Sequence, residues 1–266
     1  MQRITPMVKN ILIANIGIFV LDYFLGLRLI DFFGLRVVFS QEWMPHQFLT
    51  YMWLHSTSSF WHLFGNMFAV FIFGPMLEMA WGSKRFLTFY LVCGIGAGVF
   101  YGVADFIEKK PLHEAKEQYM VDPNPEDFKI FIVDHQPQRQ ILYQLESFSD
   151  AFFESPESEV LKSESKVYVE KIYQAYVNIP MVGASGAVFG ILMAFGMLFP
   201  NTVLYLLFPP IPIKAKYLVF FYGAYELYAE ISRSATDNVA HLAHLGGMLV
   251  AFLLLRFWKT NQNRFF

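Results

Sequence analysis

Apolar residues are gathered into six runs, and this pattern restricts the possible fold more than any other feature of the chain. The runs cover residues 10–28, 60–81, 86–106, 181–199, 214–231 and 239–257. Each is near the length of about 20 residues that an α-helix needs to cross the hydrocarbon core of a bilayer. Backbone polar groups in lipid must be bonded within the protein, which favours helices. The sequence therefore predicts an all-α membrane protein with six transmembrane helices.

The composition agrees with a protein that lies largely in lipid. Of the 266 residues, 55 % are hydrophobic and 18 % aromatic, whereas only 16 % are charged. These values exclude an ordinary soluble domain. The fifth run is the least apolar, because Lys214 and Lys216 lie at its start and Glu226 and Glu230 near its end. The single cysteine, Cys93, lies inside the third run, and we expect it to be a small packing residue.

Basic residues near the ends of the runs predict the orientation of the chain. If the chain crosses the membrane six times, nine of them fall on one side. They are Arg3, Lys9, Lys84, Arg85, Lys214, Lys216, Arg256, Lys259 and Arg264. Loops rich in lysine and arginine stay in the cytoplasm. We therefore expect both termini to be cytoplasmic and the first run to be a retained signal anchor.

Two connections on the opposite side are long. The first, residues 28–59, is aromatic but too broken to span, so we expect it to lie in the outer headgroup region. The second is an acidic insert, in which residues 105–171 hold fifteen acidic and eight basic residues, a net charge of −7. Its apolar clusters favour a small folded cap, which would restrict or recruit substrates, over a disordered loop. The chain thus divides into residues 1–104, an extracytoplasmic insert at 105–178, and residues 179–266.

A serine and a histidine lie at matching depth near the outer ends of two runs. Counted from Pro180 and Asn238, Ser185 and His244 lie about 8–9 Å below the helix starts, at a rise of about 1.5 Å per residue. A lone serine in a membrane helix commonly bonds its own i−4 carbonyl. An ionisable group inside a membrane is costly, however, and indicates a function. Together the two residue types form a nucleophile and a base.

The second run adds two polar residues at a similar depth. His62 and Asn66 are four residues apart, so they lie on one face of one helix. The second, fourth and sixth runs all enter from the outer side, so their depths are comparable. Four polar groups on three helices at one level indicate a site.

Small residues at four-residue spacing predict how two of these helices pack. The fourth and sixth runs carry, in order, Gly186, Gly190 and Ala194, and Ala243, Gly247 and Ala251. Small residues let membrane helices approach closely. Ser185 directly precedes the first series and His244 directly follows the start of the second, so close packing would bring the hydroxyl near the imidazole.

The predicted chemistry is acyl transfer by a pair that lacks a third member. The imidazole of His244 takes the proton of Ser185, whose oxygen attacks a peptide carbonyl. The developing oxyanion needs donors already aimed at it. The candidates are the Ser185 amide, the Asn66 side chain and His62.

Neighbouring residues have supporting roles in this prediction. Gly183 and Gly186 let the backbone approach a substrate closely, and Phe189, one turn below the serine, is placed to pack on the imidazole. A second histidine, His241, precedes His244 by three residues. We prefer His244 as the base, because it adjoins the small-residue series at the depth of the serine.

Three motifs contain these candidates. They are His62-Leu63-Phe64-Gly65-Asn66, Gly183-Ala184-Ser185-Gly186 and Ala243-His244-Leu245-Gly246-Gly247. Together they resemble the rhomboid intramembrane serine proteases. The resemblance implies a six-helix rhomboid-like bundle that cleaves membrane-anchored proteins in or near their transmembrane segments. In it Ser185 is the nucleophile and His244 the base, with His62 and Asn66 on the oxyanion side.

The resemblance also sets the expected partners and location. Transmembrane protein substrates and the lipid bilayer are the partners, and we expect no metal, cofactor or nucleic acid. The location implied is the inner membrane of a bacterial cell, with the site opening to the extracytoplasmic face. The chain departs from the family at Phe189, where a tyrosine is common, and in its long insert.

Two alternatives remain open at this point. His241 and His244 are spaced to share a metal ion, but a carboxylate or cysteine on a neighbouring run would have to complete the site, and we expect none. The second alternative is an inactive rhomboid-like protein that binds membrane helices without cutting them. Such a binder would have no need of the serine and the histidine together.

Overall fold

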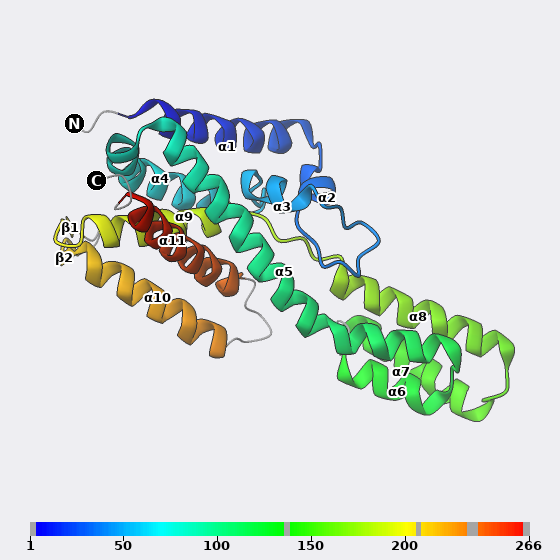
Figure 1. Ribbon diagram of the computed structural model, residues 1–266. Helices are drawn as coiled ribbons and strands as arrows, with labels where there is room; N and C mark the ends of the chain where they lie inside the picture. Colours follow the sequence, from blue (N-terminus) through cyan, green and yellow to red (C-terminus); the bar gives the residue numbers. More distant parts are fainter. Residues whose placement is uncertain (1–3, 136–138, 206–208, 233–238, 263–266) are drawn as a thin grey trace. The chain divides into compact units, whose positions relative to one another are not determined.

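Helices account for most of the chain in the computed structural model, which describes residues 4–135, 139–205, 209–232 and 239–262 (Figure 1). The chain forms two compact units. The first consists of Met1–Leu35, Met44–Ala104 and Pro180–Phe266, and the second of Arg36–Trp43 and Asp105–Ile179. Four residues used in the predictions lie outside the described ranges: Arg3, Asn238 and Arg264 entirely, and Lys259 for its side chain.

The first unit contains most of the apolar runs. Its described helices are α1 (Pro6–Leu25), α2 (Leu29–Phe33), α3 (Gln47–Thr50), the short 3₁₀ helix η1 (Tyr51–Trp53), α4 (Phe60–Trp81), the start of α5 (Ser83–Val121), α9 (Ser185–Leu198), α10 (Ala215–Ile231) and α11 (His241–Gln262). Among them α1, α4, α5 and α11 are long and apolar enough to cross a membrane. Helix α9 is apolar but only 14 residues long. Four membrane-capable helices are therefore present, and the six-span count remains a prediction.

Exposed apolar side chains show which faces lack a protein partner. Helix α10 exposes Phe220, Phe221 and Tyr228, and α1 exposes Phe24 to 76 %. Soluble monomers rarely expose large contiguous apolar patches. These faces are suited to contact with lipid.

The start of α1 is held by a carboxylate from the end of α4. Thr5 precedes α1 without capping it, and its hydroxyl donates instead to Glu78. The amides of Met7 and Val8 donate to the two Glu78 oxygens, each at 2.9 Å, and Ser83 donates at 2.5 Å. First-turn amides of a helix have no intrahelical acceptor, and the helix dipole favours an anion there. Glu78 therefore acts as the N-cap of α1 from another helix.

Polar side chains inside α1 also make hydrogen bonds within the protein. The Asn15 side chain donates to the Ile11 carbonyl at 2.8 Å, and Asp22 accepts the Leu29 amide at 2.9 Å. Both side chains are buried. The helix then ends at Gly26, whose φ of +60° lies in the left-handed region that glycine adopts readily.

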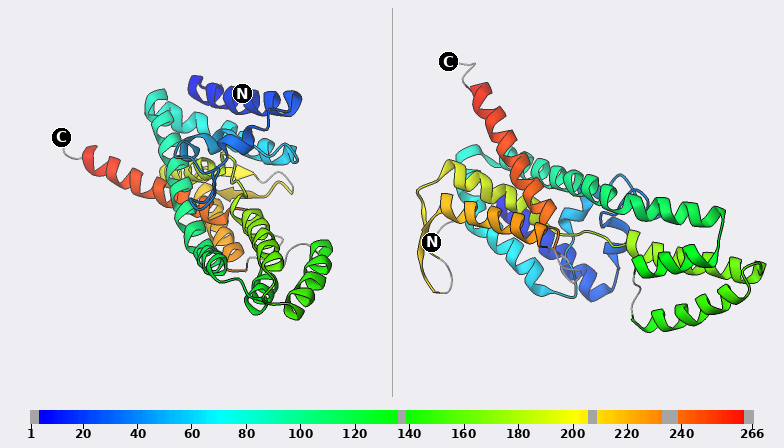
Figure 2. Two further views of the ribbon diagram at one scale, coloured as in Figure 1. Left: turned by 90° about the vertical axis from the view of Figure 1, so that its right-hand side faces the viewer. Right: turned by 90° about the horizontal axis from the view of Figure 1, so that it is seen from below.

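Helix α9 lies at the centre of the first unit, where α4, α10 and α11 contact it (Figure 2). Its contact with α11 is made backbone to backbone. A Cβ on Gly247 would overlap the Gly186 carbonyl, and one on Gly190 would lie 3.4 Å from the Gly247 carbonyl. Helix α5 covers another side, since the same Cβ on Gly190 would lie 2.7 Å from the Cβ of Cys93, a buried free thiol.

Part of the first long connection is built into this core. Tyr51 and Met52 are 2 % and 0 % exposed, and the Tyr51 hydroxyl donates to the Gly94 carbonyl at 2.6 Å. The sequence predicted an interfacial segment over residues 28–59. The stretch around Tyr51 packs against α5, and its position in the outer headgroup region stays a prediction.

The connection between α9 and α10 contains a small hairpin that the all-α prediction did not include. Strand β1 (Val203–Tyr205) pairs antiparallel with β2 (Pro212–Lys214). Pro209 and Pro210 precede the second strand, and proline cannot continue a helix. The backbone groups on either side therefore bond across the connection.

The second unit is helical and has its own hydrophobic core. It comprises the part of α5 from Asp105 onward, α6 (Pro125–Asp134), α7 (Arg139–Glu154) and α8 (Glu159–Val177), with residues 36–43. Asn124 and Ser158 cap α6 and α8 with their side chains. The fully buried members of the core are Phe128, Leu145, Phe152, Val169 and Val177.

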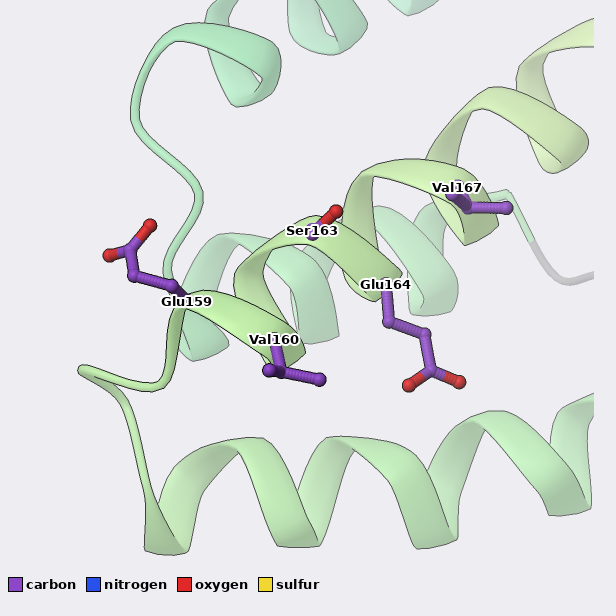
Figure 3. Close-up of a pocket in the computed structure, with 5 residues that line it drawn as sticks. All are labelled: Glu159, Val160, Ser163, Glu164 and Val167. Carbon is purple, nitrogen blue, oxygen red and sulfur yellow. The ribbon is translucent and has the colours of Figure 1, made fainter.

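The surface of α8 carries an open depression of about 550 Å³ (Figure 3). It is lined by Glu159, Val160, Ser163, Glu164 and Val167. None of these residues is a candidate from the sequence, and nothing buried and polar points into the depression. We assign it no function.

Replacing Glu78 by glutamine is expected to destabilise the first unit by about 1–3 kcal/mol, because a neutral amide leaves buried helix-start amides poorly bonded. The midpoint of thermal unfolding in detergent measures the change. Ser83→Ala removes one donor to Glu78 and leaves the carboxylate in place, so it should cost less. Equal midpoints for wild type and Glu78→Gln would show that the carboxylate does not cap α1.

Replacing Gly247 by alanine is expected to cost about 1–3 kcal/mol, because the new methyl group has no space against α9 and forces two backbones apart. Thermal unfolding in detergent again reports the effect. Gly17→Ala is the matched control, since a Cβ on Gly17 has no atom within 4 Å. The packing account is wrong if the two alanine variants unfold at the same temperature.

Candidate active site

Ser185 is the first residue of α9 and is half-buried. Ala184 precedes it as the N-cap residue, without a side-chain cap. The first amides of a helix have no intrahelical acceptor, and the helix dipole makes this end positive. An anion that forms beside the Ser185 hydroxyl would therefore meet backbone N–H donors.

Gly183 lies between this serine and the histidine of α4. Its φ is +128°, a conformation that residues with side chains rarely adopt, and its amide donates to the Tyr51 carbonyl at 3.1 Å. A Cβ at this position would lie 2.7 Å from His62 Nε2 and 3.8 Å from Ser185 Oγ. The structure thus brings the imidazole of His62 and the hydroxyl of Ser185 together, both within 4 Å of the position that a Cβ of Gly183 would take.

His244 stacks on the helix that carries the serine. Its ring lies parallel to that of Phe189, with centroids 4.2 Å apart and an interplanar angle of 7°. Phe189 is one turn after Ser185 on α9, so the stack fixes the imidazole beside the start of that helix. In the described part of the structure, Ser185 Oγ makes no hydrogen bond with His244. Such bonds are often long without substrate and tighten in the reacting complex.

Asn66 lies one turn deeper than His62 on α4. Its side-chain nitrogen donates to the His62 carbonyl at 2.9 Å, which uses one of its two N–H groups. Asn66 is 7 % exposed, whereas His62 is only partly buried. The same side-chain nitrogen carries a second N–H group.

His55 is a buried neighbour of His62 and lies in the connection over residues 28–59, which the sequence predicts to be interfacial. It is 2 % exposed, and its ring centroid lies 5.1 Å from that of His62. Burial, and to a smaller extent the charge of His62, lowers the pKa of His55 to about 3, so the ring is neutral. Neither ring nitrogen has a partner among the described residues. His55 therefore packs behind His62 instead of facing lipid.

Glu226 of α10 is the main residue that the sequence interpretation missed. Its Oε2 atom lies 2.8 Å from Nδ1 of His244 and 2.6 Å from Nδ1 of His241. All three side chains are buried, at 4 %, 8 % and 3 % exposure in that order. The expectation that no carboxylate on a neighbouring run meets these histidines is therefore wrong.

The sequence contained a signal for this contact. Glu226 is an ionisable residue inside an apolar run, and such residues face partners inside the bundle. From the sequence alone, the four charged residues only make the fifth run the least apolar of the six. Which of Glu226 and Glu230 turns inward, and toward which helix, depends on how α10 packs, and the sequence does not give that.

Glu226, His241 and His244 are also the group that offers ligand atoms for a metal ion, all within 4.8 Å of one another. Ligands of a tetrahedral zinc site, bound at about 2.0–2.2 Å, lie more than about 3 Å apart. The observed separations of 2.6 and 2.8 Å are those of hydrogen bonds. The geometry fits a proton-sharing cluster better than a metal site.

Comparison with known proteins assigns most of the first unit to one family. The family described as Rhomboid domain matches residues 42–109 and 159–259, more than half of the chain. The matched stretches contain Ser185, His244, His62 and Asn66. Residues 110–158, which include α6 and α7, lie between them.

Two curated plant proteins are similar to this chain. Rhomboid-like protein 11, chloroplastic, of Arabidopsis thaliana is 30 % identical over 91 residues, which are 34 % of this chain and 30 % of that protein. RHOMBOID-like protein 12, mitochondrial, of the same plant is 26 % identical over 273 residues, covering 97 % of this chain and 60 % of that protein. The chain thus spans less than two thirds of the length of these relatives.

Replacing Gly183 by alanine is expected to lower the rate of Ser185 modification by a fluorophosphonate at least about 100-fold, since a misplaced reacting group can cost that much. The new methyl group would displace His62 and strain the backbone. Gly26→Ala is the control, because Gly26 also has a positive φ but lies away from these side chains, with no atom near a Cβ. Equal labelling of both variants would show that Gly183 does not set the position of His62.

Proposed function

Because this chain belongs to the rhomboid family, we propose that it is an intramembrane serine endopeptidase that cleaves membrane-anchored proteins in or near their transmembrane segments. The observation that carries the proposal is the placement of Ser185 at the positive end of α9, with the imidazole of His244 stacked one turn below it on Phe189. A nucleophile, a base and a helix end that favours an anion meet at one place.

The proposed acylation proceeds by a balanced set of steps. Nε2 of His244 removes the proton from Ser185 Oγ as that oxygen attacks the carbonyl carbon of the substrate. The tetrahedral intermediate collapses when the C–N bond breaks, and the imidazolium gives its proton to the leaving amine. Water then gives a proton to His244 and attacks the ester, and the C–Oγ bond breaks to release the acid. The proton finally returns to Ser185.

Three groups are proposed to stabilise the oxyanion. The Ser185 amide points from the start of α9, and His62 and the serine hydroxyl both lie beside Gly183. The remaining N–H of Asn66 is the third donor. Donors already fixed in a water-poor site are worth several kcal/mol to a developing charge.

We further propose that the chain crosses the membrane six times, with α9 and α10 as the fourth and fifth spans. Helix α9 is shorter than a typical span, but α4, α5, α10 and α11 surround it, so it needs little contact with lipid. Helix α10 carries charges, yet Glu226 is buried on its inner side and the aromatic side chains face outward. The substrates proposed are transmembrane proteins that enter from the lipid.

The competing function is an inactive rhomboid-like protein that binds membrane helices. Such a protein would not need Ser185 to be more reactive than any other serine. Reactivity of the serine therefore separates the two functions without knowledge of the substrate.

The detergent-purified protein is expected to react covalently with a fluorophosphonate probe at Ser185, and Ser185→Ala should lose the label entirely. The serine oxygen displaces fluoride from phosphorus, which requires the same activation as attack on a carbonyl. In-gel fluorescence and mass spectrometry of the labelled peptide measure the result. Ser58→Ala is the control, because Ser58 is an exposed serine in the loop before α4. If wild type and Ser185→Ala label equally, the protein is not a serine protease with this nucleophile.

A further inference from the structure

A carboxylate and two histidines form one hydrogen-bonded cluster between α10 and α11, which lie side by side (Figure 1). A single oxygen, Oε2 of Glu226, is the partner of both Nδ1 atoms, at 2.6 Å from His241 and 2.8 Å from His244. The three side chains come from two helices that are separate in the sequence, α10 and α11. Their meeting is therefore a property of the packing.

The geometry favours one arrangement of the protons. A carboxylate oxygen within hydrogen-bond distance of two ring nitrogens is bonded most strongly when the carboxylate is ionised and both nitrogens donate to it. Each histidine then donates from Nδ1–H. The nitrogen that bonds a partner fixes the tautomer of the ring, so Nε2 of a neutral His244 carries a lone pair and no proton.

This tautomer is the one that the proposed base requires. A histidine protonated at Nε2 cannot accept the serine proton at that atom. The stack on Phe189 fixes the plane of the His244 ring, and the bond to Glu226 fixes the direction of Nδ1 within that plane. The contacts with Phe189 of α9 and Glu226 of α10 together thus fix the orientation of the His244 ring.

We propose that Glu226 is a positioning residue that completes a Glu226–His244–Ser185 triad, with His241 bonded to the same carboxylate oxygen and holding it in place. The inference rests on the proposed serine protease function. Glu226 touches neither substrate nor the reacting atoms and acts only through His244.

The cluster also balances charge during the reaction. Before the reaction it holds one negative charge, buried and stabilised by two N–H donors. When His244 takes the serine proton, the cluster becomes an imidazolium beside a carboxylate, with no net charge. A buried ion pair with good hydrogen bonds is far less costly than an isolated buried charge, so the carboxylate favours the charged form of the base that acylation needs.

Fewer contacts than Glu226 makes would be enough if its role were only structural. A buried polar residue on α10 needs one donor to be satisfied, whereas Glu226 has two, and one of them is the ring that stacks beside the serine helix. Glu230, one turn later on the same helix, is only partly buried, whereas Glu226 is buried. It therefore provides a matched control of the same chemistry.

The test measures the rate constant of fluorophosphonate labelling for the purified full chain in detergent at neutral pH. Glu226→Gln is expected to react about 100-fold more slowly than wild type, the lower end of the range for loss of general-base function. Glu226→Asp, which keeps the charge, should recover part of the rate, and Glu230→Gln should react as wild type does. A wild-type rate in Glu226→Gln would overturn the proposal.

A second measurement does not depend on the stability of a variant. In spectra of the wild-type protein labelled with ¹⁵N-histidine, His244, assigned by its absence in His244→Gln, should show a protonated Nδ1 and an unprotonated Nε2. The opposite tautomer would overturn the proposal even if Glu226→Gln fails to fold. Loss of wild-type labelling on addition of EDTA, with recovery on addition of Zn²⁺, would also overturn it, because the cluster would then be a metal site.

Ser185→Ala in the same series separates the two hypotheses. If Ser185→Ala labels like wild type, the proposed function fails. If Ser185→Ala is silent while Glu226→Gln labels at the wild-type rate, the function stands and only the role of Glu226 fails.

Discussion

The close contact between α9 and α11 is the interaction on which the candidate site depends. Gly186 and Gly247 let the two backbones touch, and Ser185 and His244 lie directly beside these glycines. In lipid there is no hydrophobic drive to bring helices together, so dispersion contacts between small residues must supply it. Side chains of ordinary size would hold the helices several ångströms further apart. The imidazole would then be out of reach of the hydroxyl, whatever its orientation.

In the first unit, several polar groups in an apolar surrounding are bonded to protein partners. Glu78 binds the amides that begin α1, Asn15 binds a carbonyl of its own helix, and Glu226 binds two histidines. An unpaired polar group in an apolar surrounding is costly. Each of these hydrogen bonds therefore stabilises the fold and also fixes the relative position of the groups that it joins. The cluster at Glu226 differs from the others, because one of its members lies beside the candidate nucleophile.

The helices and the candidate residues followed from the sequence to a considerable degree. The length of the apolar runs indicated membrane helices, and depth counting placed Ser185, His244, His62 and Asn66 at one level. The interpretation missed Glu226 and the burial of His55 for the same reason. Both depend on which side of a helix or loop faces the protein, and an apolar run without a polar face carries no signal for that direction. The hairpin between α9 and α10 was missed because proline-rich connections leave the pairing of flanking residues open.

By itself, the sequence determined that this chain has apolar runs long enough for membrane helices and that it has the motifs of a rhomboid, and it predicted a common depth for a serine, two histidines and an asparagine. These inferences follow from residue type and spacing along single helices, which obey a fixed period. Only the tertiary structure decided that the ring of His244 stacks on Phe189, that His62 and Ser185 both lie beside Gly183, and that Glu226 contacts His241 and His244. Those contacts depend on the rotation and spacing of several helices at once, which are set by how their side chains pack together.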